Sequence, residues 1–230
     1  MKTTAIVPVY NENPDKLNLF LDELKQYVDD IVIVDDGSTN NLQQTTYNKQ
    51  QFTVVSRQSL VILRHEINRG QGAALQTGTD YAMRNGANII VHIDGDGQHK
   101  PENIPALIKP IQQGQADIVF GSKFLDKTNH IPWTKKHLII PIARIINFLF
   151  SGLWLTDAHN GLRAFRAAVG DKLYLSHDHM AHATEYLQLV KKNRLRYIEV
   201  GVNVNYYCYG QNLDDGIKIV KELLTEKIFK

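Results

Sequence analysis

Apolar and polar positions along the first half of the chain change period in a regular way. Near-continuous apolar runs predict buried strands over residues 3–9, 30–36, 60–65, 87–94 and 116–122. Helical periodicity predicts helices over residues 14–28, 70–86, 101–114 and part of the polar segment that follows residue 36. Apolar strands that alternate with helices are typical of a mostly parallel sheet with helices on both faces. The pattern therefore predicts an α/β fold.

Polar side chains stand where three of these strands end. Segment 8–12 (PVYNE) follows the first strand, segment 35–38 follows the second, and Asp94 and Asp96 follow the fourth. In open parallel sheets, ligands bind in a crevice beyond the carboxyl ends of the strands. We therefore expect these three segments to meet at one binding site.

The sequence DGDGQ at residues 94–98 places two carboxylates one residue apart. Like charges at that spacing repel, and each carboxylate loses hydration where its site is partly buried. A metal ion, a basic side chain or solvent would offset this cost. Mg²⁺ and Mn²⁺ favour oxygen ligands and are often held by one or two carboxylates, and Gln98 offers a further carbonyl oxygen. A solvated turn is the alternative for this motif taken alone.

Two further motifs each allow a structural and a functional interpretation. The sequence VDDGS at residues 34–38 favours either an ordinary strand-to-loop turn or part of a ligand site. The sequence NRGQGAALQTG at residues 68–78 favours either a tightly packed helix start or an anion site at a helix N-terminus. Each motif is weak alone, but their combination with the acid pair at successive strand ends is far more specific.

Composition narrows the class of protein only slightly. The chain has 230 residues, of which 43% are hydrophobic and 22% charged, and its net charge is +2. This length suits one domain with a substantial core, and the small net charge gives no reason to expect a nucleic-acid partner. The single cysteine excludes an intramolecular disulfide, and the N-terminal residues lack the apolar segment of a signal peptide. We expect a single cytoplasmic domain over residues 1–230.

The motifs together resemble those of a known family. The sequences PVYNE, VDDGS, NRGQGAA, DGDGQH, FGSKF and DAHNGLRAF occur in the order and spacing of the family 2 glycosyltransferases. The chain is most similar to their polyprenyl-phosphate branch, which includes dolichyl-phosphate mannose synthase, from Thr4 to about Gln211. The resemblance implies the nucleotide-diphosphosugar transferase fold, also called the A-type glycosyltransferase fold. It also implies Mg²⁺ or Mn²⁺, a nucleotide-sugar donor, a polyprenyl phosphate acceptor and inversion at the anomeric carbon.

The resemblance also implies roles for individual residues. The donor-binding residues would be Pro8, Tyr10, Glu12, Asp36, Gly70, Asp94 and Lys123. The metal ligands would be Asp94, Asp96 and Gln98. The catalytic residues would be Asp96, Arg163 and Asp157. This chain departs from the family pattern at Lys123, where Arg is usual, at Gln71, where Lys is common, and at Gly201, where Pro is frequent.

The nature of the acceptor determines whether a general base is needed. A hydroxyl acceptor, such as a sugar on a lipid-linked or polysaccharide substrate, needs a base, and Asp157 or Glu185 is the candidate. A lipid phosphate is already ionised and needs only positioning by cations, for which Arg163, Lys123 and Arg166 are available. A non-catalytic nucleotide-sugar-binding partner is the alternative from another class of protein, but the intact acid pair argues against it.

Residues 137–155 form an almost wholly apolar stretch interrupted by Arg144 and Asn147. These polar residues argue against a transmembrane span and favour an amphipathic helix in the membrane interface. A core or dimer helix is the alternative. Residues 213–229 predict a second amphipathic helix, which either closes the fold or contacts the membrane. We therefore expect peripheral binding to the cytoplasmic face of a membrane, directly or through a separate small membrane protein, and an oligomer is possible.

Overall fold

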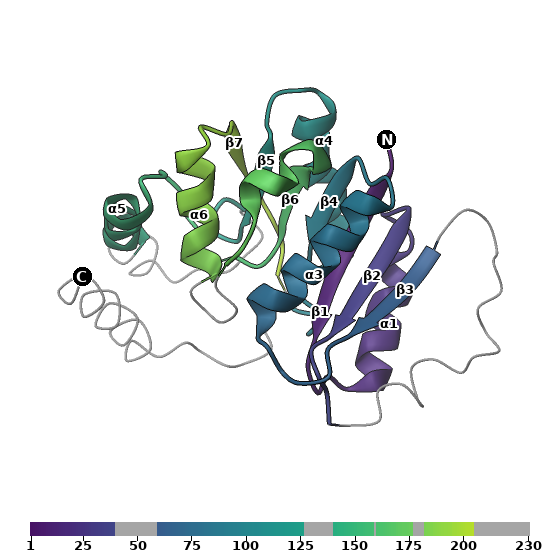
Figure 1. Cartoon of the computed structure of the whole chain (residues 1–230). Helices are drawn as coiled ribbons and strands as arrows, with labels where there is room; N and C mark the ends of the chain where they lie inside the picture. The colour runs from purple at the N-terminus through teal and green to yellow at the C-terminus, as the bar shows by residue number, and fades with distance from the viewer. Residues whose placement is uncertain (40–58, 127–139, 159, 177–181, 205–230) are drawn as a thin grey trace.

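The computed structural model of the chain describes residues 1–39, 59–126, 140–158, 160–176 and 182–204 (Figure 1). Within these residues, seven strands form a single sheet in the order β3-β2-β1-β4-β6-β5-β7. The strands are β1 (Thr3–Val9), β2 (Asp30–Asp35), β3 (Ser59–Arg64), β4 (Ile89–His92), β5 (Ile118–Ser122), β6 (Arg163–Arg166) and β7 (Tyr197–Gly201).

Helices connect the strands, as the alternating pattern predicts. They are α1 (Pro14–Leu24), α3 (Gln71–Arg84), α4 (Ile104–Gln112), α5 (Ile140–Ser151) and α6 (His182–Lys192), with the 3-10 helices η1 (Pro101–Asn103) and η3 (Ala167–Leu173). The start of α1 follows from its sequence. The side chain of Asn13 accepts hydrogen bonds from the backbone N–H groups of Asp15 and Lys16, and Pro14 occupies the first turn.

The sheet is mostly parallel, which confirms the predicted fold class. Strand β1 lies between β2 and β4 and is parallel to both, and β3 continues the parallel order beyond β2. Strand β6 is antiparallel to β4 and β5, whereas β7 is parallel to β5. The reversal of β6 pairs Arg163, its first residue, with His92, the last residue of β4. Arg163 therefore reaches the end of the sheet at which Asp94 and Asp96 lie.

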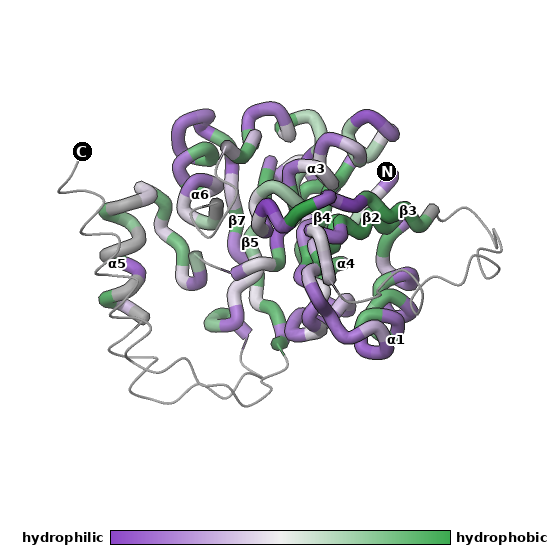
Figure 2. Tube along the Cα trace, turned by 60° about the horizontal axis from the view of Figure 1, so that its bottom comes forward, coloured by the Kyte–Doolittle hydropathy of each residue, from purple (hydrophilic) through white to green (hydrophobic). Residues whose placement is uncertain are grey.

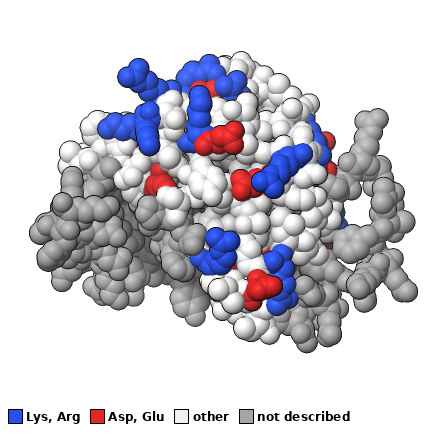
Figure 3. Space-filling model, viewed as in Figure 1, with Lys and Arg blue, Asp and Glu red and all other residues white. Residues whose placement is uncertain are grey.

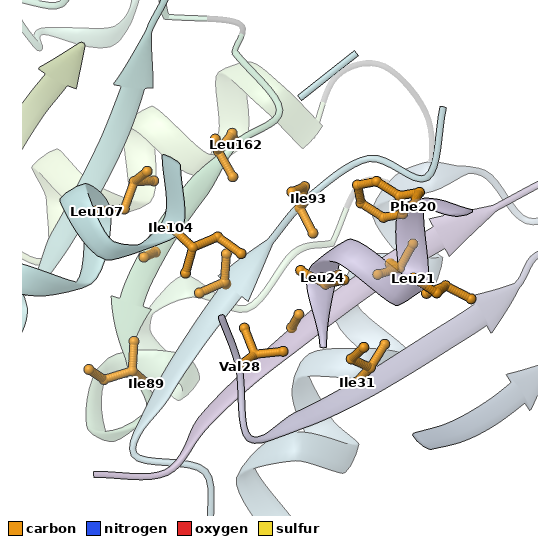
Figure 4. Packing of buried hydrophobic residues seen from close by; sticks show 14 of the residues in the cluster. Phe20, Leu21, Leu24, Val28, Ile31, Ile89, Ile93, Ile104, Leu107 and Leu162 are labelled. Atoms are coloured by element: carbon orange, nitrogen blue, oxygen red, sulfur yellow. The ribbon is translucent and has the colours of Figure 1, made fainter. Parts of the chain in front are cut away.

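Hydrophobic side chains pack against both faces of the sheet. On one face, α1 and α4 cover the strands, and Phe20, Leu24 and Leu107 lie in that cluster (Figure 4). On the other face, α3 and α6 contribute Leu75 and Tyr186 to a second cluster. Full burial of a side chain of this size contributes roughly 1.5–3 kcal/mol, so the two layers hold the strands rigidly in register.

Several boundaries differ from the predicted ones. Helix α1 ends at Leu24 rather than near residue 28, because the chain must turn there so that the N–H of Asp29 can donate to the carbonyl of Thr3. Strand β4 ends at His92 rather than at Asp94, since the acid pair belongs to the turn that follows. Most of the polar segment after residue 36, and the predicted helix over residues 213–229, lie outside the described residues.

Helix α5 covers most of the predicted stretch over residues 137–155, of which 137–139 lie outside the described residues. It stands apart from the layers that flank the sheet, next to α6 (Figures 1 and 2). Its side chains at Ile142, Ile145, Phe148 and Leu149 are 44–68% exposed. Among the described residues, no helix has the length and apolar character needed to cross a bilayer.

Charged side chains of both signs are interspersed on the face seen in Figure 1, and Lys and Arg gather along the edge above α6 and β7 (Figure 3). Part of this charge is balanced by Asp117, which precedes β5 and pairs with Arg166 and Arg196. This cluster lies at the amino ends of β5 and β7, opposite the end at which Asp94 and Asp96 lie.

Candidate active site

A cleft of about 380 Å³ opens beyond the carboxyl ends of β1, β2 and β4. It is lined by Pro8, Val9, Tyr10, Glu12, Asp36, Asn68, Gly70, Gln71, Ala74, Asp94, Gly95 and Asp96. Small-molecule sites typically have volumes of about 300–1,000 Å³, so the cleft is large enough for part of a nucleotide sugar. The three segments that the sequence predicts to meet do so here.

Asp94 is held from two sides at the floor of this cleft. Its Oδ1 accepts a hydrogen bond of 2.7 Å from Nε2 of Gln71, the first residue of α3. On the other side, a Cβ added to Gly161 would lie 2.0 Å from Oδ2 of Asp94, so only glycine leaves room for the carboxylate. Burial raises the pKa of Asp94, while the charge of Arg163 and the hydrogen bond from Gln71 lower it.

Two further carboxylates share the negative potential of Asp94. Burial and the charge of Asp94 raise the pKa of Asp96, although the backbone N–H of Gln98 donates a bond of 2.9 Å to its Oδ1. Burial, followed by the charges of Asp96 and Asp94, raises the pKa of Glu12. The protein therefore gathers negative charge here without compensating it fully.

Gln98 contacts Asp96 through its backbone, and the residue is exposed at the surface. This contact does not involve the side-chain carbonyl of Gln98, so a role of that oxygen as a metal ligand stays a prediction. Within the described residues, no group of three His, Cys, Asp or Glu side chains is close enough to hold a metal ion. Among the described residues, the candidate metal site therefore rests on the two carboxylates of Asp94 and Asp96, with Gln98 as the further predicted ligand.

Asp36 lines the cleft but is engaged by the protein. Its Oδ1 accepts from the N–H of Arg69 at 2.9 Å and lies 2.7 Å from Nδ1 of His65, and its Oδ2 accepts from the N–H of Gly70 at 2.7 Å. The residue as a whole is buried, with 3% of its surface exposed. These bonds fix the backbone at Gly70, where φ is +102°, and thereby the start of α3.

Arg163 is buried, with 2% of its surface exposed. Its guanidinium lies 4.6 Å from the centre of the Tyr186 ring, and Nη2 donates to the carbonyl of Asn160 at 3.2 Å. Its Nε and Nη1 have no hydrogen-bond partner among the described residues. The guanidinium is close enough to Asp94 to lower the pKa of that carboxyl group. Arg163 thus supplies positive charge beneath the cleft.

A second group of predicted residues surrounds Asp157. Its Oδ2 accepts from the backbone N–H of Lys123 at 3.1 Å and from Nδ2 of Asn160 at 2.9 Å, while Nζ of Lys123 lies 3.7 Å from Oδ1. Glu199, on β7, accepts from the N–H groups of Thr156 and Asp157 at 2.8 and 3.0 Å. This network fixes Asp157 and links it to Lys123.

His99 lies between the two groups. Burial lowers its pKa to about 4, although the charges of Asp96 and Asp157 raise it and those of Lys123 and Arg163 lower it. The imidazole is therefore neutral at neutral pH. The backbone of His99 forms a bridge with Val204, and Asn103 exchanges hydrogen bonds with Asn203 at 2.8 and 3.0 Å. These contacts anchor residues 203–204 beside the acid pair.

The alternative base, Glu185, serves a structural purpose. Its carboxylate accepts from the backbone N–H of Ser176 at 3.0 Å and from the hydroxyl of the same residue. This bond joins the N-terminal turn of α6 to the segment that follows η3. Of the two candidate general bases for a hydroxyl acceptor, Asp157 is therefore the better placed.

Four residues that hold the site had no predicted role. Gln71 and Gly161 position Asp94, while Asn160 and Glu199 position Asp157. The Asn160-Gly161 dipeptide is a turn signal in the sequence, and Asn160 reaches Asp157 within that turn. The approach of Gly161 to Asp94 is instead set by the pairing of β6 with β4. Nothing in the local sequence of Glu199 indicates that it binds a loop more than forty residues earlier.

The order of the strands and the acidic cleft beyond their carboxyl ends correspond to the A-type glycosyltransferase architecture. The sequence model described as glycosyl transferase family 2 matches residues 4–174, and the chain belongs to this family. It is therefore a glycosyltransferase.

Relatives with assigned activities extend over most of the chain. The UDP-N-acetylglucosamine–dolichyl-phosphate N-acetylglucosaminyltransferase of Methanococcus voltae is 32% identical over 241 residues, which cover 98% of this chain and 96% of that protein. The undecaprenyl-phosphate mannosyltransferase of Micrococcus luteus is 30% identical, with 73% of this chain and 67% of that protein covered.

The likeness to solved structures concerns the fold. The crystal structure of glucosyl-3-phosphoglycerate synthase from Mycobacterium tuberculosis, in complex with Mg²⁺ and UDP, superposes with a TM-score of 0.61. The two chains are 17% identical, and the match covers 97% of this chain and 78% of the other. The A-type glycosyltransferase fold predicted from the motifs is thus confirmed.

Proposed function

We propose that this glycosyltransferase moves a sugar from a nucleotide diphosphosugar to a polyprenyl phosphate, with inversion at the anomeric carbon. The observation that carries the proposal is the set of incompletely compensated carboxylates at the end of β4, in a cleft of suitable size for a nucleotide. The relatives support the choice of acceptor, because two of them are named for transfer to dolichyl or undecaprenyl phosphate.

Mg²⁺ or Mn²⁺ fits the residues at the floor of the cleft. Arg163 lowers the pKa of Asp94, yet the pKa values of Asp94, Asp96 and Glu12 all remain raised. A divalent cation at Asp94 and Asp96 would relieve this repulsion and would neutralise the diphosphate that leaves. Metal dependence is therefore part of the proposal.

The remaining cleft residues bind the donor in this proposal. Pro8, Tyr10, Glu12 and Asp36 contact the nucleoside, and Asp36 can still accept one hydrogen bond because a carboxylate has about four acceptor positions. Gly70 allows the donor to approach the backbone at the start of α3. Lys123, which belongs to the group of residues around Asp157, places positive charge near the transferred sugar and the donor diphosphate.

The acceptor requires positioning rather than activation. A phosphate monoester is ionised at neutral pH, so its oxygen can attack the anomeric carbon without a general base from the protein. The state of Asp157 supports this view, since its carboxylate is already engaged by Lys123 and Asn160. Lys123 and Arg163 reduce the repulsion between the incoming phosphate and the leaving diphosphate, while the phosphate attacks from the opposite face of the sugar.

Transfer to a sugar hydroxyl is the second candidate. It is favoured by the burial of Asp157, which is 7% exposed, and by its proximity to the neutral imidazole of His99. The variant Asp157→Asn distinguishes the two acceptors. Its amide keeps the shape of the side chain but removes the base, so transfer to a hydroxyl would be abolished while transfer to a phosphate would be retained in large part.

The test of the function is an assay of the purified chain with UDP-sugars and GDP-sugars in the presence of undecaprenyl phosphate. We expect lipid-linked sugar to form with Mg²⁺ or Mn²⁺ and not with a chelator. The matched variants are Asp96→Asn and Asp22→Asn, the second of which lies on the exposed face of α1. Equal turnover with and without the metal, or product only with sugar hydroxyl acceptors, would contradict the proposal.

We propose that α5 binds the membrane surface peripherally and that the protein takes its lipid phosphate acceptor from that membrane. Trp154 lies beside the helix, with its ring 5.4 Å from that of Phe148 and 4.8 Å from the guanidinium of Arg144. An aromatic and aliphatic face with a cation at its edge is typical of helices that lie in a membrane interface. Membrane binding through α5 would place the phosphate of a lipid at the surface of the enzyme that carries this helix.

Liposome flotation tests this part of the proposal. Wild-type protein should float with anionic vesicles, and Ile145→Glu or Phe148→Glu should abolish flotation. The control is Leu19→Glu, which changes a side chain that is 68% exposed on α1. A wild type that does not float, or a control that behaves like the α5 variants, would contradict direct membrane binding through α5. If Ile145 and Phe148 also proved buried in a subunit contact, α5 would be an oligomer element.

A further inference from the structure

We infer that Gln71 is a positioning residue that holds the Asp94 carboxylate in the orientation in which it binds the divalent cation. The inference rests on the proposed metal-dependent transfer and adds a residue to it. Its basis is the hydrogen bond of 2.7 Å from Nε2 of Gln71 to Oδ1 of Asp94, within the cleft that both residues line.

Gln71 is well suited to this task because its own backbone is fixed. It is the first residue of α3 and directly follows Gly70, whose N–H donates to Asp36 at 2.7 Å. The preceding residue, Arg69, donates its N–H to the same carboxylate at 2.9 Å. The Asp36 carboxylate thus fixes the start of the helix, and the amide of Gln71 extends from that fixed point to Asp94.

The two oxygens of Asp94 have different neighbours. Oδ2 packs against the backbone of Gly161, where even a methyl group would collide with it, and Oδ1 receives the amide of Gln71. Rotation of the carboxylate would break the hydrogen bond or drive an oxygen into Gly161. The orientation is therefore set before any ligand arrives, and pre-set ligands bind a cation with less reorganisation.

The neutrality of Gln71 matters as much as its hydrogen bond. An amide orients the carboxylate without cancelling its charge, so the attraction of Asp94 and Asp96 for a cation is retained. A lysine at position 71 would place an ammonium group against Asp94 and repel a divalent ion. The same ammonium would attract the diphosphate of a nucleotide when no metal is bound. Opposite effects on metal and on metal-free nucleotide are thus expected from one substitution.

A direct contact between Gln71 and the donor is the competing explanation. In that case Gln71→Leu would weaken nucleotide binding equally with and without metal. If Gln71 acts through Asp94, the same variant weakens Mn²⁺ binding and leaves metal-free nucleotide binding unchanged. The two explanations therefore differ in a measurement that does not depend on turnover.

The experiment is a titration of Mn²⁺ into the whole chain, followed by the electron paramagnetic resonance signal of the free ion, with saturating UDP and separately with GDP. Gln71→Leu should bind Mn²⁺ about ten- to a hundredfold more weakly, as expected for the loss of a hydrogen bond that orients a metal ligand. Gln71→Lys should bind it more weakly still, while calorimetry without metal shows tighter UDP or GDP binding. Gln112→Leu, at an exposed position on α4, is the matched control and should match the wild type.

The outcomes separate this inference from the proposed function. Equal Mn²⁺ affinity in the wild type, Gln71→Leu and Gln71→Lys would overturn the role of Gln71 and leave the metal-dependent reaction intact. A wild type that takes up no Mn²⁺ with either nucleotide would overturn both. Weaker Mn²⁺ binding in Gln71→Leu, with metal-free nucleotide binding and the control unchanged, would establish Gln71 as a positioning residue.

Discussion

Two pairs of aspartates follow strands of the same sheet, yet the protein treats them differently. Asp35, the last residue of β2, and Asp36, which follows it, are buried and accept hydrogen bonds from several protein groups. Those groups are the N–H of Ser38, the N–H of Arg69, the N–H of Gly70 and the ring of His65. Oδ2 of Asp35 has no hydrogen bond among the described residues but lies 3.4 Å from Nη1 of Arg64. Asp94 and Asp96, after β4, are less well satisfied: Asp94 accepts from the side chain of Gln71, and Asp96 accepts from the N–H of Gln98 and from its own N–H.

This difference supports the proposal that the second pair binds a cation. Groups whose charge is satisfied by the protein stabilise the fold, whereas groups that keep unsatisfied charge lower the stability of the free protein and are typical of functional sites. The first pair accordingly shapes the loop that begins α3. The second pair holds negative charge that a cation can use.

The largest effect is expected from the second pair. Asp96→Asn should reduce sugar transfer by at least about a hundredfold, as is typical when a main electrostatic contribution to a transition state is removed. The melting temperature in chelator should stay equal or rise, because the variant removes charge repulsion from the free protein. Transfer assays and thermal denaturation check these two expectations, and a variant that loses activity because it unfolds would contradict the contrast.

The first pair should show the reverse behaviour. Asp36→Asn places an amide donor where the N–H groups of Arg69 and Gly70 both need an acceptor. We expect the free energy of unfolding to fall by about 2–3 kcal/mol, the cost of leaving buried polar groups unpaired. Urea denaturation with chelator measures this. The fall in the free energy of unfolding should be the same in the presence of Mn²⁺. Asp94→Asn, the equivalent change in the second pair, is the control.

Local signals account for what the sequence predicts well. The apolar runs locate β1, β2 and β5 to within two residues, since a buried parallel strand needs uninterrupted apolar side chains. Asn13 and Pro14 mark the start of α1 for the same local reason. The clustering of the strand ends in one cleft also follows, because parallel strands place their carboxyl ends at one edge of the sheet.

Long-range pairing accounts for what the sequence does not predict. The antiparallel course of β6 brings Gly161 and Arg163 to Asp94, and no periodicity within β6 indicates that direction. The bond from Gln71 to Asp94 joins residues of different elements, so it depends on how α3 is placed over the sheet. Glu199 reaches Thr156 through the position of β7 at the sheet's far side.

A smaller effect is expected from pH. The pKa values of Asp94, Asp96 and Glu12 are raised above their ordinary values of 3.8 for Asp and 4.5 for Glu. Cation binding needs the ionised carboxylates, so Mn²⁺ affinity should fall several-fold as the pH is lowered, beginning above those ordinary values. Calorimetric titrations over a pH series measure it. The decline should be shallower in Glu12→Gln, and a pH-independent affinity would contradict the raised pKa values.

The smallest effect concerns Asp117, whose charge is compensated at the opposite end of the sheet. Hydrogen bonds from the side chain of Arg196 are the main cause that lowers its pKa to about 2, and Arg166 adds to the effect. A depressed pKa stabilises the folded state above the unfolded pKa, and this contribution disappears as the pH falls through the folded value. Asp117→Asn should therefore lower the free energy of unfolding by about 1 kcal/mol at neutral pH, a modest amount because both arginines are half-exposed and screened by solvent.

The sign of this pH dependence is the opposite of that expected for Asp96. The raised pKa of Asp96 makes its ionised form unfavourable in the folded, metal-free protein, so its contribution to stability is lost as the pH rises above the unfolded value. Urea denaturation in chelator between pH 3 and pH 7 compares the two variants. The difference between wild type and Asp117→Asn should grow with pH in favour of the wild type. The difference for Asp96→Asn should grow in favour of the variant, and a common sign for the two would show that the acid pair is as well compensated as Asp117.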